Sequence, residues 1–131
     1  MDFFTADGKS IEISDLSKHS KVKGMVDLAI GKNTQSMFDD HHRVIGGNAT
    51  DQALMKFIGE ETFHVLEADK ECTVTASQGF NSANKFSQAR IESLGKTFYK
   101  GLEIVVQNYN LSCLLGSFRT ASHSKAHVGT L

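Results

Sequence analysis

The sequence lacks the features that would place it among membrane or nucleic-acid-binding proteins. No apolar run approaches the roughly 18 to 20 residues of a membrane-spanning helix, and the start, MDFFTAD, has no basic signal-peptide segment. The formal net charge is only −1, which gives no global electrostatic reason to bind nucleic acid or an anionic bilayer. We therefore expect a soluble, cytoplasmic chain that does not itself insert into a membrane.

Cysteine and proline are also scarce. Cys72 and Cys113 are isolated in the sequence, with neither the paired spacing of a zinc site nor the density of a disulfide scaffold. We expect both to be reduced thiols. Proline is absent, although about 5% is usual and loops commonly use it to end helices and fix turns.

The remaining composition is that of an ordinary globular protein. Of the 131 residues, 40% are hydrophobic and 22% are charged, which suits one core rather than two. We expect one domain over residues 1–115. After Leu115 the sequence is rich in Ser, Thr, His, Gly and Lys without a clear period, so residues 116–131 are expected to form a loose tail.

Hydrophobic periodicity and turn residues predict the elements of the first half. Apolar residues recur at three- and four-residue spacing in two stretches, which is typical of amphipathic helices. A polar, turn-like stretch over residues 33–42 separates the first helix from the next strand. The predicted elements are a β-hairpin around Asp7-Gly8, a helix over 21–30, a strand over 43–45, and a helix from Asn48 or Thr50 to Gly59.

The second half is richer in β-branched and aromatic residues. Residues 72–80, 85–91 and 96–100 are predicted to be successive antiparallel strands, separated by polar turns. Residues 101–109 are predicted to form a closing helix, although their β-branched content leaves a strand open. Together these elements predict an α/β (α+β) fold in which helices flank an antiparallel β-sheet.

Three segments carry residue types that suit recognition of ATP by its base. Such a site needs a planar side chain to stack on adenine, a cation, and close backbone approach through glycine. Residues 46–54 (GGNATDQAL) run from glycines into a helix start, residues 80–85 (FNSANK) join an aromatic to a lysine, and residues 98–101 (FYKG) end a strand. Taken singly, each is explained by structure alone: a helix cap, a hairpin and a strand end.

In this order and at these separations, the three segments resemble the nucleotide-binding domain of P-type cation-transporting ATPases, especially the calcium-pump-like branch. The family's Gly-x-Ala-Thr-Glu/Asp-x-Ala-Leu pattern matches residues 47–54. Its Phe-x-Ser-x-x-Lys pattern matches Phe80, Ser82 and Lys85. The start of its Lys-Gly-Ala-Pro-Glu segment matches Lys100-Gly101, where Leu-Glu replaces Ala-Pro-Glu. The resemblance covers roughly residues 3–106.

The resemblance implies a nucleotide-binding site without catalytic or metal-binding residues of its own. Its members would be Asp51 near the base, Phe80 stacked on adenine with Ser82 beside it, Lys85 and Lys100 attracting the phosphates, and Gly101 permitting close approach of the ligand. ATP would be the ligand and would bring Mg²⁺. The family's phosphate-contacting arginine has no clear counterpart, since Arg119 lies in the unmatched tail.

A complete pump also needs an Asp-Lys-Thr-Gly-Thr segment with a phosphorylated aspartate, which does not occur here. By resemblance, the phosphorylation domain and the membrane helices of a parent pump would be the partners. The chain would then lie at the cytoplasmic face of a membrane, and it would hold ATP without completing the reaction. The alternative is a non-catalytic interaction or regulatory α/β domain that has lost nucleotide binding.

Three other groups of residues have functional residue types. Residues 39–42 (DDHH) could ligate a metal, but adjacent side chains on extended chain point apart, which favours a solvated loop. His123 and His127 fall in the expected tail. Cys72 and Cys113 have no base or oxyanion hole brought to them by any sequence pattern.

Overall fold

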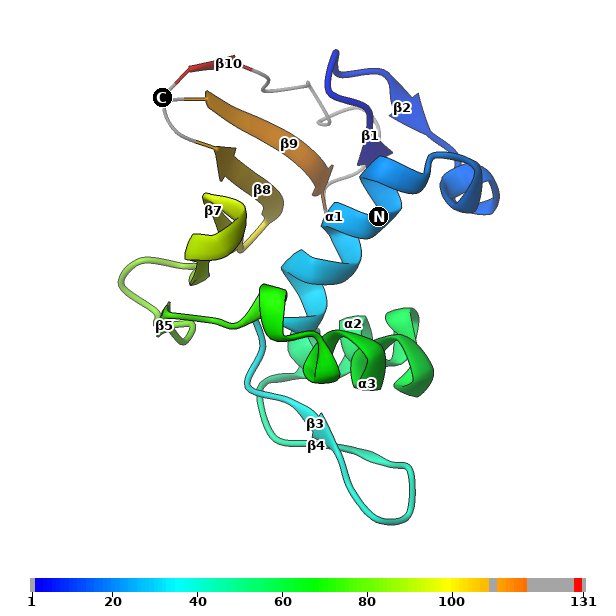
Figure 1. The fold of residues 1–131 in the computed structure, drawn as a ribbon, viewed down its shortest axis with the longest axis vertical. Helices are drawn as coiled ribbons and strands as arrows, with labels where there is room; N and C mark the ends of the chain where they lie inside the picture. Colours follow the sequence, from blue (N-terminus) through cyan, green and yellow to red (C-terminus); the bar gives the residue numbers. More distant parts are fainter. Residues whose placement is uncertain (1, 109–110, 118–128, 131) are drawn as a thin grey trace.

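The computed structural model describes residues 2–108, 111–117 and 129–130, and most of its strands belong to one antiparallel sheet (Figure 1). The order across the sheet is β2-β1-β9-β8-β7-β6-β5, and β10 also pairs with β9. The strands are β1 (Asp2–Phe4), β2 (Ser10–Ile11), β5 (Ala76–Gln78), β6 (Ser87–Ile91), β7 (Lys96–Lys100), β8 (Glu103–Asn108), β9 (Leu111–Ser117) and β10 (Gly129–Thr130).

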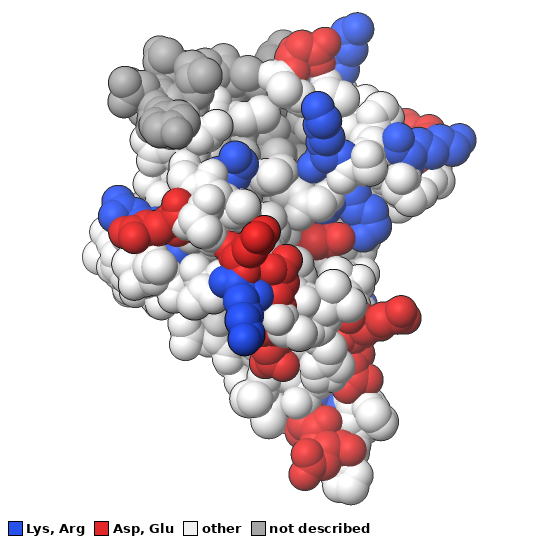
Figure 2. Space-filling model, viewed as in Figure 1, with Lys and Arg blue, Asp and Glu red and all other residues white. Residues whose placement is uncertain are grey.

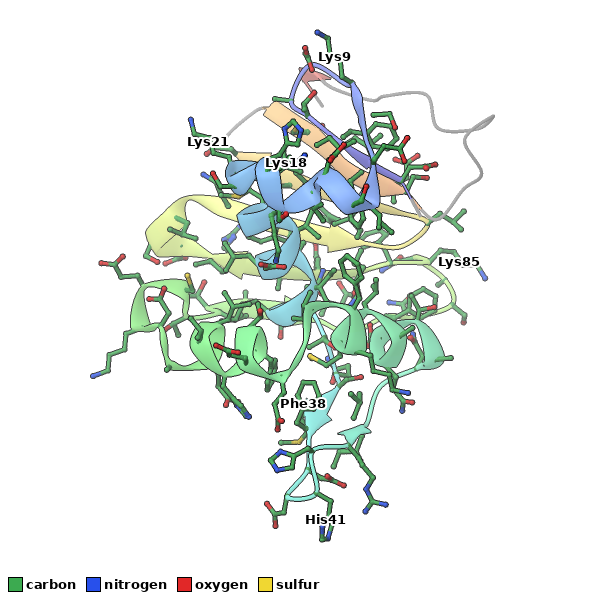
Figure 3. The ribbon with its side chains drawn as sticks, turned by 90° about the vertical axis from the view of Figure 1, so that its right-hand side faces the viewer. Lys9, Lys18, Lys21, Phe38, His41 and Lys85 are labelled. Atoms are coloured by element: carbon green, nitrogen blue, oxygen red, sulfur yellow. The ribbon has the colours of Figure 1, made fainter. Side chains whose placement is uncertain are left out.

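Helix α1 packs against one face of this sheet, and α2 and α3 pack against α1 and against each other. In Figure 3, α1 lies in front of the strands, with α2 and α3 below it. The α-helices are α1 (Ser20–Gly31), α2 (Ala49–Ile58) and α3 (Glu60–Ala68), and the short 3₁₀ segments are η1 (Ile13–Lys18), η2 (Lys70–Cys72) and η3 (Glu92–Leu94). The predicted class is therefore confirmed: helices flank an antiparallel sheet in an α+β fold.

The core lies between α1 and the sheet and continues under α2 and α3. Val26 and Ile30 of α1 meet Phe98 of β7 and Ile104 of β8, and all four are at most 1% exposed. Met55 of α2 is fully buried in the same cluster. Burial of each such side chain stabilises the fold by about 1.5–3 kcal/mol. Packing on this core positions the ends of the helices relative to the sheet.

Most locally predicted elements are confirmed. The N-terminal hairpin pairs Phe3 with Ile11, and α1 and β4 (Val44–Ile45) fall where the pattern places them. Asn48, rather than Thr50, is the N-cap of α2, because its side-chain oxygen accepts a hydrogen bond from the Asp51 N–H at 2.8 Å. Strands β5, β6 and β7 are successive and antiparallel, as predicted.

Three elements differ from prediction. The helix predicted over residues 101–109 is wrong: β8 is a strand, and its β-branched residues pair with β7 and β9 on both sides. Strand β3 (Met37–Phe38) lies within the stretch expected to be turn-like and pairs with β4. Helix α3 was not predicted, and it is held by Phe63, whose ring packs 5.6 Å from that of Phe38.

The expected boundary at residue 115 falls inside β9, which runs Leu111–Ser117. Leu115 and Ser117 are both buried. Beyond them, β10 pairs with β9 in antiparallel register. The rest of the expected tail, residues 118–128 and 131, lies outside the described residues, as do Arg119, His123 and His127.

The β3–β4 hairpin projects beyond α2 and α3 at the lower end of the molecule (Figure 1). Figure 2 shows Asp and Glu side chains along this end, where the hairpin carries Asp39 and Asp40 and α3 begins with Glu60 and Glu61. Within the described residues, none of the helices has the length and hydropathy of a membrane span.

Candidate functional site

A pocket of about 660 Å³ lies between the start of α2, the end of β7 and the loop that joins β5 to β6. This volume falls in the range of small-molecule sites, about 300–1,000 Å³. The pocket brings together the three segments that the sequence singled out, from three separate elements. Its lining consists of Asn48, Thr50, Asp51, Phe80, Lys85, Ser87, Lys100, Gly101 and Leu102.

Five of the six predicted site residues contribute to this lining, namely Asp51, Phe80, Lys85, Lys100 and Gly101. The sixth, Ser82, is exposed on the loop and lies outside the lining. The fold thus brings the predicted residues together where the start of α2 meets the end of β7 through the Asp51–Lys100 ion pair.

The polar floor of the pocket is a buried ion pair. Lys100 Nζ lies 2.6 Å from Asp51 Oδ1, and the two side chains are 3% and 5% exposed. The same ammonium donates to the Asn33 carbonyl, and the second Asp51 oxygen accepts from the Gln35 N–H at 3.3 Å. Burial lowers the pKa of Lys100 below its usual value, although the hydrogen bond to Asp51 opposes that effect.

Asn33 connects this floor to the sheet. It is 3% exposed, and its side-chain Nδ2 donates to the carbonyls of Ser87 and Phe98, each at 3.1 Å. Ser87 begins β6 and Phe98 lies in β7, so one amide group ties the end of α1 to two strands. The sequence offers no signal for this role, because an asparagine just after a helix is already explained by the helix end.

Gly101 allows the chain itself to approach closely. A Cβ at this position would lie 2.6 Å from the Lys85 carbonyl oxygen and 3.2 Å from the Phe86 Cβ. The resemblance implied that this glycine leaves room for the ligand. In the structure, the room beside it is occupied by the loop that joins β5 to β6.

That loop holds Phe80 and Lys85 at the pocket. The Asn81 side chain accepts from the Asn84 N–H at 2.6 Å, and the Asn81 carbonyl accepts from the Lys85 N–H at 2.8 Å. Lys85 has a left-handed φ of 64°, which is uncommon for a residue other than glycine. Its side chain extends outward from the ribbon (Figure 3) and has no ion pair with any described residue.

Phe80 presents an open aromatic surface at the same place. Its side chain is 48% exposed, and its ring contacts no other ring among the described residues. A half-exposed ring that lines a cavity can stack against a flat ligand. The site therefore combines an aromatic face, one exposed cation and a buried, internally paired floor.

The other candidate residues have local structural roles. Residues 39–42 form the tip of the β3–β4 hairpin (Figure 3), where the Asp39 carboxylate accepts from the His41 and Arg43 N–H groups at 2.9 Å. Burial raises the pKa of the Cys72 thiol and also that of Cys113. Within the described ranges, His, Cys, Asp and Glu residues form no group of three that could hold a metal ion.

A pH-dependent contact between His42 and Glu60 joins the β3–β4 hairpin to the first turn of α3. His42 Nδ1 lies 2.8 Å from Glu60 Oε1. The hydrogen bond to Glu60 raises the pKa of His42 above its ordinary 6.5, and the same bond lowers the pKa of Glu60 below 4.5. The contact is therefore fully stabilising between pH 4.5 and 6.5, and it is lost as the pH rises through the raised pKa of His42.

We predict that Glu60→Gln lowers the pKa of His42 and removes this pH-dependent part of the free energy of unfolding. NMR titration of the His42 ring and urea unfolding across the pH range would measure both quantities. Glu61→Gln is the matched control, since it removes the neighbouring carboxylate from the same helix turn. An unchanged His42 midpoint in the Glu60→Gln protein would show that the contact does not form.

Comparison of the chain with known protein families, with curated proteins and with solved structures gave no match. The function of the pocket must therefore be inferred from its own residues. Its aromatic and charged residues are an exposed phenylalanine, an exposed lysine and a buried lysine–aspartate pair.

Proposed function

We propose that this chain is the ATP-binding domain of a P-type cation-transporting ATPase, with the fold of that family's nucleotide-binding domain. The observation that supports the proposal most is the convergence of residues 47–54, 80–85 and 98–101 on one pocket. These are the segments that resemble the family's motifs, and they are far apart in the sequence. Unrelated motif matches would have no reason to meet at one cavity of nucleotide size.

The pocket suits the base of the nucleotide. The exposed ring of Phe80 stacks on adenine, a contact worth about 1–3 kcal/mol for a base on an aromatic side chain. The Asp51–Lys100 pair lies at the floor and faces the polar edge of the base. Lys85 stands at the rim and attracts the phosphates, which carry Mg²⁺ with them.

In this proposal the chain binds ATP, and other domains of the pump carry out phosphoryl transfer and cation transport. The domain holds ATP by the adenine and presents the γ-phosphate to a phosphorylation domain, whose aspartate accepts it. The membrane helices of the same pump then move the cation, calcium by the branch that the motifs resemble. The domain would work at the cytoplasmic face of that membrane.

Titration with ATP, followed through backbone amide shifts, tests the proposal. We expect saturable shifts at Phe80, Lys85 and Gly101 at millimolar ATP, because an isolated, half-open site leaves the phosphates largely in water. Inorganic tripolyphosphate is the control: it carries a comparable charge without a base and should leave Phe80 unshifted. A flat response around the pocket at millimolar ATP would refute nucleotide binding.

A second candidate is an interaction or regulatory domain that keeps this fold without nucleotide. It is favoured by the completeness of the Asp51–Lys100 pair, which satisfies both charges within the protein. The pair then has only a structural role. Replacement of Phe80 by alanine distinguishes this candidate from the first, because only the first predicts a loss of ATP binding.

A further inference from the structure

We infer that the pocket recognises the adenosine part of its ligand and is nearly indifferent to the number of phosphates attached. This inference rests on the proposed function and narrows it to a ligand class: adenosine compounds, from the nucleoside to the triphosphate, bind with similar affinity. It follows from where the structure places the groups that were expected to meet the phosphates.

Lys100 is not available to a phosphate. Its side chain is 3% exposed, and its ammonium is already bonded to Asp51 and to the Asn33 carbonyl. Movement of the ammonium toward a phosphate would leave the Asp51 carboxylate buried without a counter-ion, which is strongly unfavourable. Lys100, which was expected to attract the phosphates together with Lys85, therefore keeps its bonds within the protein.

The backbone N–H of Gly101 is also unavailable, because it already makes a hydrogen bond within the protein. Its N–H donates to the Glu103 carbonyl at 3.0 Å, and the space beside its Cα is filled by the Lys85 carbonyl. Neither a free donor nor an open approach remains there for a phosphate oxygen.

The start of α2 does not replace these groups. The Asp51 N–H is bonded to the Asn48 side chain, and the Gln52 N–H is bonded to the Asn48 carbonyl. The carboxylate of Asp51 lies in the same first turn and offsets the positive end of the helix dipole. A phosphate at this helix end would find the Asp51 and Gln52 N–H groups already bonded, and it would lie beside the Asp51 carboxylate.

Lys85 is the one charged group of the pocket lining that remains free to meet a phosphate among the described residues. It is exposed on a surface loop, where a single ion pair with solvent-exposed partners contributes little. Lengthening the phosphate chain thus adds at most about a fivefold gain in affinity. The aromatic contact of Phe80 is present for every adenosine compound alike.

The experiment compares adenosine, AMP, ADP and ATP as ligands of the whole chain at one ionic strength, by amide-shift titration. The same series is repeated on Lys85→Gln and on Lys21→Gln. Lys21 is an exposed lysine at the start of α1, away from the pocket lining (Figure 3), so its replacement changes the net charge equally. The dissociation constants from adenosine to ATP should differ by less than about fivefold in the unaltered chain and in Lys21→Gln, and should become equal in Lys85→Gln.

An affinity for ATP more than about fivefold above that for adenosine would overturn the inference while leaving nucleotide binding intact. The inference is overturned in the same way if the phosphate-dependent part of the affinity survives in Lys85→Gln. If none of the four ligands shifts the pocket amides, adenosine included, the proposed function fails and this inference fails with it.

Discussion

Lys100→Met is expected to lower the free energy of unfolding by about 3–5 kcal/mol. The replacement removes the ammonium that lies 2.6 Å from the Asp51 carboxylate and leaves that carboxylate 5% exposed without a counter-ion. The methionine fills a similar volume, so the loss comes from charge rather than from a cavity. Urea unfolding followed by circular dichroism measures the change.

Two further variants make this result specific. Lys96→Met alters the same strand at a half-buried lysine without a carboxylate partner among the described residues, and should change stability by about 0.5 kcal/mol or less. Adding Asp51→Leu to Lys100→Met removes the stranded charge and should restore much of the lost stability. If Lys100→Met destabilises no more than Lys96→Met, the buried pair does not have the role assigned to it.

Phe80→Ala is expected to weaken ATP binding by about 5- to 150-fold, which at millimolar affinity means no measurable binding. The variant removes the aromatic face on which the base stacks. Stability should change little, because the side chain is 48% exposed and its ring contacts no other described ring. Amide-shift titration with ATP and urea unfolding give the two quantities separately.

Phe57→Ala is the matched control for this prediction. Phe57 is 41% exposed and lies on α2, but its ring stacks on Phe3 at 5.7 Å and does not line the pocket. Its loss should therefore reduce stability and spare ATP binding. If neither the unaltered chain nor Phe80→Ala responds to ATP, the interaction-domain candidate replaces the nucleotide-binding one; if both bind ATP equally, Phe80 does not stack on the base.

The sequence was sufficient to predict those elements whose turn, cap and periodicity signals lie within a few neighbouring residues. The Asp7-Gly8 turn predicts the first hairpin, because the left-handed backbone at Gly8 (φ 85°) suits it. The amphipathic spacing before Gly31 predicts α1, and the cap at Asn48 with Gly59 (φ 88°) predicts α2. These features depend on backbone preference and on one apolar face, both of which can be read from neighbouring residues.

The elements that were missed depend on distant partners. Residues 103–108 contain β-branched residues at positions that suit either a helix face or a strand, and pairing with β7 and β9 selects the strand. Helix α3 is short and polar, and the packing of Phe63 on Phe38 from another element helps to hold it. Short helices owe most of their stability to such tertiary contacts.

For the site, the sequence by itself determined which residue types are present: an aromatic, two lysines, an aspartate and a glycine in three segments. Only the tertiary structure decided how they are used. Asp51 and Lys100 become partners because the fold brings the start of α2 to the end of β7, and the Asn33 carbonyl, 67 residues from Lys100, accepts a further hydrogen bond from the ammonium. Lys100 is buried and serves as the counter-ion of Asp51, because a charge removed from water needs an opposite charge beside it. Lys85 is exposed and stays free for a ligand.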